Sequence, residues 1–399
     1  MPARPKPAPP KPAGTPGRPQ PVPTLPIALI ITIFFFAVDA MVGQANRSGY
    51  MELIDSIVDD EQPSFLPGTQ RPLLKEYTGF PTLDRLFAML NVFFANVADG
   101  SAPALSLFAF YFGTQMIPFF SILMVESQRV LKASSLFFNP VAWGFLMQTV
   151  GFGIIFPVFL VHHLLYTTKF TLPESVRLRD PSKLHAVVPA FLLGYILLSV
   201  LVAVPFPHAH MRQWCLAIWQ AFPLYVVFLQ AAFTGLLKRL SIGKNSFTPK
   251  AHIERAALSH AYGFAWNVAV TGQLFTIAVL ATSAFFPGLY PDGVAEALSL
   301  EKMFIPGPPH SWEPMTSAAS SFHDYLRYDL YLGSVAGIIW AVHLLSQVKP
   351  ATTSEEQKDL GRGLLRSLLL SGPGGTMIAL LQHRDDTVLA EELKAEKKH

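Results

Sequence analysis

Eight apolar segments, most of them close to the about 20 residues that cross a bilayer, divide the chain. The second is the weakest, because LDRLFAMLNVFFANV is short and carries Asp84, Arg85 and Asn91. A helix lying in the membrane interface is the alternative for it. The pattern predicts an all-α fold, a polytopic membrane bundle over 24–348 with eight transmembrane helices. The segments are 24–43, 82–98, 103–125, 138–165, 186–206, 214–237, 261–287 and 329–348.

The two ends of the chain differ from this bundle. Residues 1–23 are basic and Pro-rich, which predicts a disordered tail because such a sequence forms neither helix nor sheet. Residues 349–399 are predicted to be a cytosolic C-terminal segment. Within it, the apolar part of 355–382 is interrupted by GPGG, and each half is too short to span, so an interfacial helix is expected. GPGG is interpreted as a turn, because it lacks the lysine and spacing of a phosphate-binding loop.

Composition supports a membrane protein. Hydrophobic residues make up 51% of the chain and charged residues 14%, whereas soluble proteins carry roughly a quarter charged residues. The lipid bilayer is therefore the expected surrounding. The net charge of +3 is small and not clustered, so no nucleic-acid partner is expected.

Loop charges predict the orientation. With the N-terminal tail in the cytosol and eight crossings, the basic segments face the cytosol and the acidic segments face the other side, as the positive-inside rule requires. The loop 126–137, with Arg129 and Lys132, is the one exception. Omitting the second crossing corrects this loop but misplaces two longer basic loops, so eight crossings fit better. The basic segments are 166–185, 238–260 and the C-terminal tail, and the acidic segments are 44–81 and 288–328.

In this topology several acidic residues meet at the outer ends of the helices. A carboxylate at membrane depth costs several kcal/mol unless it is paired, protonated or in contact with water. Burial favours the protonated form of a carboxyl group, which can then act as a general acid. The alternative is that each acid is a solvated helix end. The acids are Asp39, Asp84, Glu126 and Asp329, with His323 and Asp324 just before the last, and the catalytic candidates are Glu126, Asp84, Asp329 and Asp324.

Glu126 and Arg129 are three residues apart, so they share one face if the helix continues that far. Glu126 is then the proton donor or the residue that orients it, while Arg129 keeps a neighbouring carboxylate ionised. A close arginine also stabilises the charged form of Glu126 itself. If the two residues pair, Asp84, Asp324 or Asp329 becomes the better candidate for the acid and Glu126 becomes the organiser.

Other polar residues in the apolar segments are candidates for ligand contacts. Trp266, Asn267 and Gln273 lie along one segment, where the amides could hold a ligand hydroxyl or cross-link helices. His162 and His163 are adjacent and point about 100° apart on a helix, so interfacial anchoring is the favoured role.

No metal or cofactor is predicted from the motifs. The aspartate-rich helix motifs that bind metal are absent, because Asp59-Asp60-Glu61 lies in a loop and Asp385-Asp386 in a tail. Nucleotide-binding and serine-hydrolase motifs are also absent. The sequence is still compatible with a reaction that begins with protonation of a neutral substrate.

Three stretches, 78–100, 112–129 and 139–165, resemble a group of fungal polytopic membrane proteins of secondary-metabolite pathways. This group includes the meroterpenoid membrane terpene cyclases of ascofuranone-type pathways. The shared pattern is a TG-x-P-x-x-D segment, an E-x-x-R that ends an apolar helix, and a helix rich in Pro, Gly and Gln. The matching residues are Thr78, Gly79, Pro81 and Asp84, then Glu126 and Arg129, then Pro140, Gly144, Gln148, Gly151, Gly153 and Pro157.

The resemblance implies a terpene cyclase of the endoplasmic reticulum that closes a ring on an epoxidised, farnesyl-type prenyl chain. A buried acid would protonate the epoxide, without metal or redox cofactor, and an apolar bundle would shield the cation. The partner would be a small apolar prenylated substrate, with the candidate contacts Arg129, Gln148, Trp266, Asn267 and Gln273. A transporter or accessory protein of such a pathway is the alternative, although the sequence reveals neither an inverted repeat nor a matched pair of broken helices.

Overall fold

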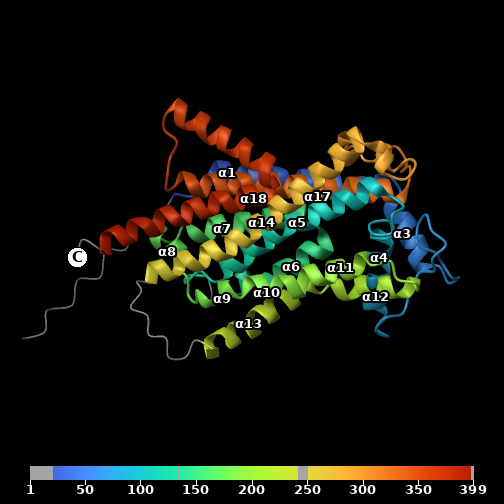
Figure 1. Ribbon diagram of the computed structural model, residues 1–399, viewed down its shortest axis with the longest axis horizontal. Helices are drawn as coiled ribbons and strands as arrows, with labels where there is room; N and C mark the ends of the chain where they lie inside the picture. Colours follow the sequence, from blue (N-terminus) through green and yellow to red (C-terminus); the bar gives the residue numbers. More distant parts are fainter. Residues whose placement is uncertain (1–20, 133–134, 241–249, 397–399) are drawn as a thin grey trace, which may run out of the picture.

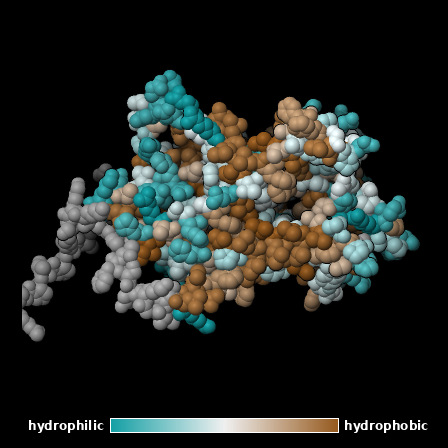
Figure 2. Space-filling view, viewed as in Figure 1, coloured by the Kyte–Doolittle hydropathy of each residue, from teal (hydrophilic) through white to brown (hydrophobic). Residues whose placement is uncertain are grey.

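The computed structural model describes residues 21–132, 135–240 and 250–396, and these residues form an elongated bundle of helices (Figure 1). Most of the predicted tail, 1–23, lies outside them. On the face shown in Figure 2, apolar residues cover the middle of the bundle and polar residues gather toward both ends. Phe35, Phe228 and Phe275 are more than half exposed. Large exposed rings suit contact with lipid, so the chain is an all-α integral membrane bundle.

In the part of the chain that the structure describes, five helices are long and apolar enough to cross a membrane, and a sixth crossing results if a pair bent by 60° is one span. The expected count of about eight is therefore a loose one, higher than these five or six candidates. The five are Thr24–Arg47, Pro103–Ser127 (α5), Lys250–Phe285 (α14), Ala318–Ser346 (α17) and Ser354–Lys394, and the bent pair is His210–Trp219 with Phe222–Leu240. Thr24–Arg47 comprises α1 (Thr24–Ala37), η1 (Val38–Gly43) and α2 (Gln44–Arg47), and Ser354–Lys394 lies in α18 (Ser354–Glu396). The bent pair lies in α12 (Ala209–Trp219) and α13 (Phe222–Leu240).

One expected crossing is missing because its helix is too short. The second apolar segment forms α4 (Pro81–Phe93), which has 13 residues. At about 1.5 Å per residue such a helix is about 20 Å long, less than the roughly 30 Å of a bilayer core.

A second crossing is lost because the chain turns back at Gly151. The expected segment 138–165 forms α6 (Pro140–Val150) and α7 (Phe152–Thr167), and Gly151 between them has φ +113°. Trp143 packs on Phe159 with ring centroids 5.4 Å apart, and Phe138 packs on His163 at 6.2 Å. These antiparallel pairs show a helical hairpin that enters and leaves the bundle at the same end.

The chain breaks again at Gly372, in the GPGG sequence, which confirms the expected turn. Gly372 has φ +66° and ψ −173°, and the two halves of α18 form a V (Figure 1). The half before Gly372 is mostly exposed, whereas Met377, Ile378 and Leu381 in the second half are fully buried. Half of the segment expected as a cytosolic interfacial region therefore packs inside the bundle. The described chain therefore contains two broken helical segments, at Gly151 and at Gly372.

The loss of the α4 crossing and of the 138–165 crossing leaves the later loops on the sides expected for them. Because α4 does not cross and α6–α7 turns back, only the two loops that flank α5 change sides. Val130 N–H donates to Arg177 O at 2.9 Å, and Lys238 pairs with Asp180 at 2.5 Å, so the three basic loops meet at one end. The exception to the positive-inside rule disappears. Which compartment this end faces stays a prediction.

We name the two ends by their loops. The basic end consists of 128–132, 135–139, 166–185 and 347–353, and the acidic end of 48–102 and 286–317. The acidic end contains α3 (Tyr50–Asp59), α4, η4 (Pro287–Leu289), α15 (Val294–Ala297) and α16 (Leu300–Phe304). The basic end contains η2 (Leu136–Phe138), α8 (Leu172–Val176) and α9 (Ser182–His185). Between them, α10 (Val187–Phe191), η3 (Leu192–Ile196) and α11 (Leu197–Ala203) form a shorter apolar helix.

Candidate active site

Asp329 lies inside the bundle, at the turn of the α6–α7 hairpin. It is 11 residues into α17, about 17 Å along the helix axis from its first residue. Only 5% of Asp329 is exposed. Its Oδ1 accepts a hydrogen bond of 2.6 Å from the backbone N–H of Gly153, in the first turn of α7. The carboxyl group therefore caps a helix that begins within the apolar band.

The turn is closely fitted around this acid. The hydroxyl of Tyr325, one helical turn before Asp329, donates to the carbonyl of Val150 at 3.1 Å. A Cβ atom on Gly151 would lie 2.7 Å from Met41 Cε, 2.9 Å from the Tyr325 hydroxyl and 3.0 Å from Asp329 Oδ1. Glycine has no Cβ atom to clash here and readily adopts φ +113°, so no other residue fits this position. The break in the helix thus brings Tyr325 and Asp329 to the same backbone segment.

Asp329 makes no ion pair with any residue that the structure describes. A buried carboxylate without a cation is unfavourable, so the site suits a neutral carboxylic acid. Aromatic rings surround the hairpin turn. Phe119 stacks on Phe152 with centroids 4.3 Å apart, and Phe322 stacks on Tyr325 at 6.2 Å. The faces of such rings stabilise cations.

A pair of amides lies beside the same turn. Gln148, three residues before Gly151, donates from Nε2 to Oε1 of Gln220 at 3.0 Å. Gln220 is 6% exposed, and its own Nε2 has no hydrogen-bond partner among the described residues. Next to it, Trp219 packs on Phe94 and Phe222 at 5.9 and 5.5 Å. The free amide N–H is thus a donor for an oxygen of a ligand.

Glu126 lies at the opposite end from the one expected, in a buried cluster of charges at the basic end. Its Oε1 is 3.1 Å from Arg129 Nε, and its Oε2 is 2.5 Å from Lys132 Nζ and 2.9 Å from His163 Nε2. Glu126 is fully buried. With cations on both oxygens, it is held as a carboxylate.

The sequence missed the partners of this cluster. Arg129 pairs with Asp385 at 2.6 Å, and Tyr262 donates to the same carboxylate oxygen at 3.0 Å. His163 Nδ1 accepts from Trp340 Nε1 at 3.1 Å. No local signal linked Asp385 to Glu126, because 259 residues separate them along the chain.

The pKa values of Arg129 and Lys132, the two cations in the loop after α5, shift in opposite directions. Burial opposes the charge on Arg129, but Asp385 and Glu126 outweigh this and raise its pKa. Burial lowers the pKa of Lys132 to about 8, because Glu126 offsets the burial only in part and Arg129 and Arg384 repel the ammonium.

Glu126 does not join the other acids, so the expected cluster at the outer end is wrong for this residue. Trp340, which shares His163 with Glu126, is 11 residues beyond Asp329, about 17 Å further along α17. Of the remaining acids, Asp39 pairs with Arg47 at 2.7 Å on the first span.

Asp84 and Asp324 hold loops of the acidic end. Asp84 accepts from the backbone of Thr78 at 2.7 Å and of Gly79 at 3.0 Å. Burial alone would raise the pKa of Asp84, but these hydrogen bonds lower it. Asp324 pairs with Arg327 at 2.6 Å and accepts from Gly307 N–H at 3.1 Å. Both groups have structural partners.

The three candidates on α14 do not face Asp329. Gln273 donates to Leu369 O at 3.3 Å, in the exposed half of α18. Asn267 is exposed and Trp266 is half-buried against the core. No group of three or more His, Cys, Asp or Glu residues suited to a metal ion occurs in the described part of the chain.

The match to known proteins covers nearly all of this architecture. A family model described as the CtvD domain matches residues 26–389. The chain belongs to the CtvD-domain family. This CtvD-domain protein is matched from α1 into the second half of α18, so the family's domain includes both broken helices and extends beyond the expected boundary at 348.

Several curated relatives are similar over most of their length. Terpene cyclase ascI of Acremonium egyptiacum is 27% identical over 321 residues, which cover 77% of this chain and 79% of the relative. Terpene cyclase ctvD of Aspergillus terreus is 25% identical over 364 residues, covering 88% and 96%. Terpene cyclase janA of Penicillium janthinellum is 26% identical over 321 residues, covering 79% and 82%. These names confirm the resemblance to fungal membrane terpene cyclases. No solved structure matches the chain.

Proposed function

We propose that this CtvD-domain protein is a membrane-bound terpene cyclase that closes a ring on the epoxidised, farnesyl-type chain of a meroterpenoid. The family and the names of its relatives support cyclase activity. The observation that carries the mechanism is Asp329, a buried carboxyl group without a cation, beside aromatic rings and a free amide donor.

In the proposed reaction Asp329 gives its proton to the epoxide oxygen. The bond from that oxygen to the more substituted carbon breaks, and positive charge develops there. A hydroxyl oxygen or an alkene of the substrate forms the new bond to this carbon. The proton lost by the attacking hydroxyl, or by a neighbouring carbon, returns to the Asp329 carboxylate. The reaction is an isomerisation, so it requires no oxidant or reductant.

The other residues have supporting roles in this proposal. The rings of Phe152, Phe322 and Tyr325 stabilise the cation and exclude water. Gln148 orients Gln220, which donates to an oxygen of the substrate. Glu126 and Arg129 organise the basic end and do not contact the substrate.

A transporter is the alternative function. The two broken helices are a feature that transporters also use for binding. The relatives reported above are all named terpene cyclases, so this alternative is not favoured. For location, we propose the endoplasmic reticulum with both termini in the cytosol, because the basic loops share one end.

The decisive experiment compares Asp329→Asn with the wild type in membranes that contain equal amounts of folded protein. The substrate is an aromatic compound with a terminal epoxide on its farnesyl chain. Asparagine keeps the oxygen that caps Gly153 but cannot donate a carboxylic proton. We expect turnover to fall by about 10²–10⁴ with little change in melting temperature. Turnover within a few-fold of the wild type would remove Asp329 from the mechanism, and an inactive wild type would contradict the proposed function.

A further inference from the structure

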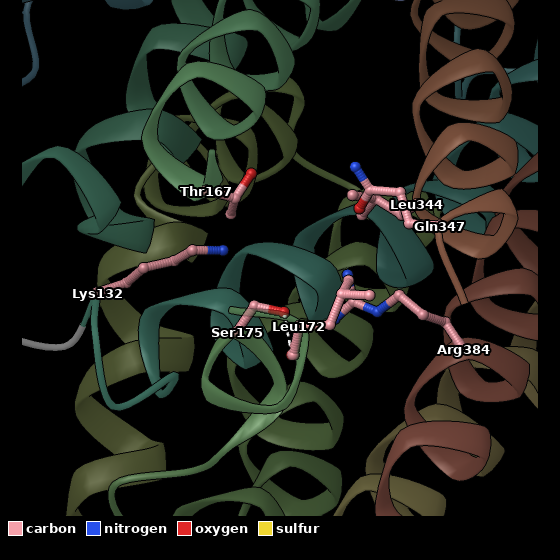
Figure 3. Close-up of a pocket in the computed structure, with 7 residues that line it drawn as sticks. All are labelled: Lys132, Thr167, Leu172, Ser175, Leu344, Gln347 and Arg384. Carbon is pink, nitrogen blue, oxygen red and sulfur yellow. Dashed lines mark hydrogen bonds between the residues drawn. The ribbon is translucent and has the colours of Figure 1, made fainter. Parts of the chain in front are cut away.

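We propose that the basic end binds a phosphate-type anion, either free phosphate or the phosphate of an anionic lipid, between Lys132 and Arg384. The two side chains line one small cavity together with Thr167, Ser175 and Gln347. Figure 3 shows Lys132 and Arg384 reaching toward it from opposite sides, from the loop after α5 and from α18. Nothing in the cyclase mechanism uses this cavity.

Among the described residues, Arg384 donates only one hydrogen bond, from Nε. It is 3% exposed, and its Nε donates to Asp385 Oδ1 at 2.8 Å. Its Nη2 is also 2.8 Å from that oxygen, but the geometry is not that of a hydrogen bond, and Nη2 has no other partner among the described residues. A buried charged donor left without an acceptor costs free energy. The guanidinium is thus oriented for an acceptor that the chain does not supply.

Lys132 offers a donor on the other side. Its Nζ lies 2.5 Å from Glu126 Oε2 and 2.6 Å from His163 Nε2. Because His163 Nδ1 accepts from Trp340, Nε2 of the neutral ring carries the proton and donates to Glu126, so it does not accept from Lys132. An ammonium group has three N–H donors, so two remain for a ligand. The hydroxyls of Thr167 and Ser175 already donate to backbone carbonyls at 2.8 and 2.7 Å. Lys132 and Arg384 are therefore the groups that can donate hydrogen bonds to a ligand in the cavity.

The charge balance of the cluster also favours an anion. Arg129, Lys132 and Arg384 are three cations, and Glu126 and Asp385 are two carboxylates, so one positive charge is left over when histidine is neutral. The lowered pKa of Lys132, about 8, has the same cause, because burial and its cationic neighbours outweigh Glu126. An anion would supply the missing negative charge.

The size of the cavity limits how the anion binds. Its enclosed volume is about 10 Å³, room for one water-sized atom. One phosphate oxygen fits there, between the two cations, while the rest of the group stays in the open mouth. Basic pockets between membrane helices bind lipid headgroups in this way.

The test measures binding without turnover, so its failure is distinct from failure of the cyclase proposal. Purified protein in neutral-lipid nanodiscs is titrated with inorganic phosphate by calorimetry. A parallel preparation uses nanodiscs that contain phosphatidic acid, and native mass spectrometry counts the retained lipid. Binding of free phosphate identifies the soluble anion, whereas retention of phosphatidic acid alone identifies the lipid headgroup. No binding of either probe to the wild type would overturn the proposal.

Three variants locate the site. Arg384→Gln removes the free guanidinium, and Ser175→Leu fills the mouth but keeps both cations. Arg255→Gln is the matched control, because Arg255 pairs with Asp386 at 2.7 Å at the same end but does not line the cavity. We expect binding to weaken by about tenfold or more in the first two variants and to be unchanged in the control. Equal weakening in Arg255→Gln would indicate diffuse attraction and contradict the site, as would unchanged binding in Ser175→Leu with a normal melting temperature.

Discussion

The backbone N–H of Gly153 lies 2.6 Å from Oδ1 of Asp329, so an acid on one helix caps another that begins inside the membrane band. The second broken helix, α18, is also capped by a side chain from another helix, but that side chain does not titrate. The N–H of Gly374 donates to Oε1 of Gln115 at 2.9 Å, just after the break at Gly372. An amide is sufficient to cap a buried helix end. The carboxyl group at the first break therefore does more than the architecture requires, which is consistent with a chemical role.

The α6–α7 turn should tolerate no side chain at Gly151. Gly151→Ala places a Cβ against Met41 and Tyr325 at a positive φ, which costs about 1–3 kcal/mol in backbone strain before any clash. We expect a lower melting temperature and less folded protein in detergent. Gly235→Ala in α13 is the control, because a Cβ there contacts nothing within 4 Å. A Gly151→Ala protein as stable as the control would contradict the geometry of the turn.

Glu126→Gln should affect stability more than chemistry. It leaves Arg129 and Lys132 buried without their shared carboxylate, and breaking such a buried pair costs about 3–5 kcal/mol. We expect a lower melting temperature, with turnover per folded molecule much closer to normal than in Asp329→Asn. The measurement is turnover normalised to folded protein. A loss of turnover as large as in Asp329→Asn, at normal stability, would restore Glu126 as the proton donor.

Gln220→Leu should impair substrate binding. The free Nε2 of Gln220 can donate to a substrate oxygen, and losing one such hydrogen bond corresponds to a roughly tenfold higher KM. Gln230→Leu is the matched control, because Gln230 is also a buried amide but donates to Lys183 O at 3.0 Å. If both variants raise KM equally, the effect is structural and Gln220 is not a substrate contact.

The topology can be tested by labelling single cysteines. In a Cys215→Ala background, cysteine replaces Leu136 at the basic end or Phe80 at the acidic end, which are 87% and 68% exposed. In sealed microsomes a membrane-impermeant maleimide should label the cysteine at 136 and leave the one at 80 unlabelled until the membrane is opened. Eight crossings predict the same side for both positions. Labelling of both, or of position 80 alone, would overturn the proposed orientation.

Hydrophobic pattern and loop charge were enough to identify a polytopic helical membrane protein, because a bilayer requires long apolar helices and sorts basic loops to one side. The motifs also indicated the cyclase family and contained Gln148 and Glu126, and the predicted topology placed Asp329 among the site candidates. Hydropathy could not decide whether an apolar stretch such as 138–165 crosses or turns back. That depends on one glycine at a positive φ and on a capping acid that is 176 residues away along the chain.

Only the tertiary structure decided which polar groups meet. Asp385 and Trp340 reach the Glu126 cluster from helices far along the chain, and the break at Gly372 brings the second half of α18 into the bundle. Buried charges must find partners wherever the packing of helices provides them, and spacing within one helix contains no information about its neighbours. Glu126 and Asp329 looked alike as acids at helix ends. The packing of the helices places cations next to Glu126 and aromatic rings near Asp329.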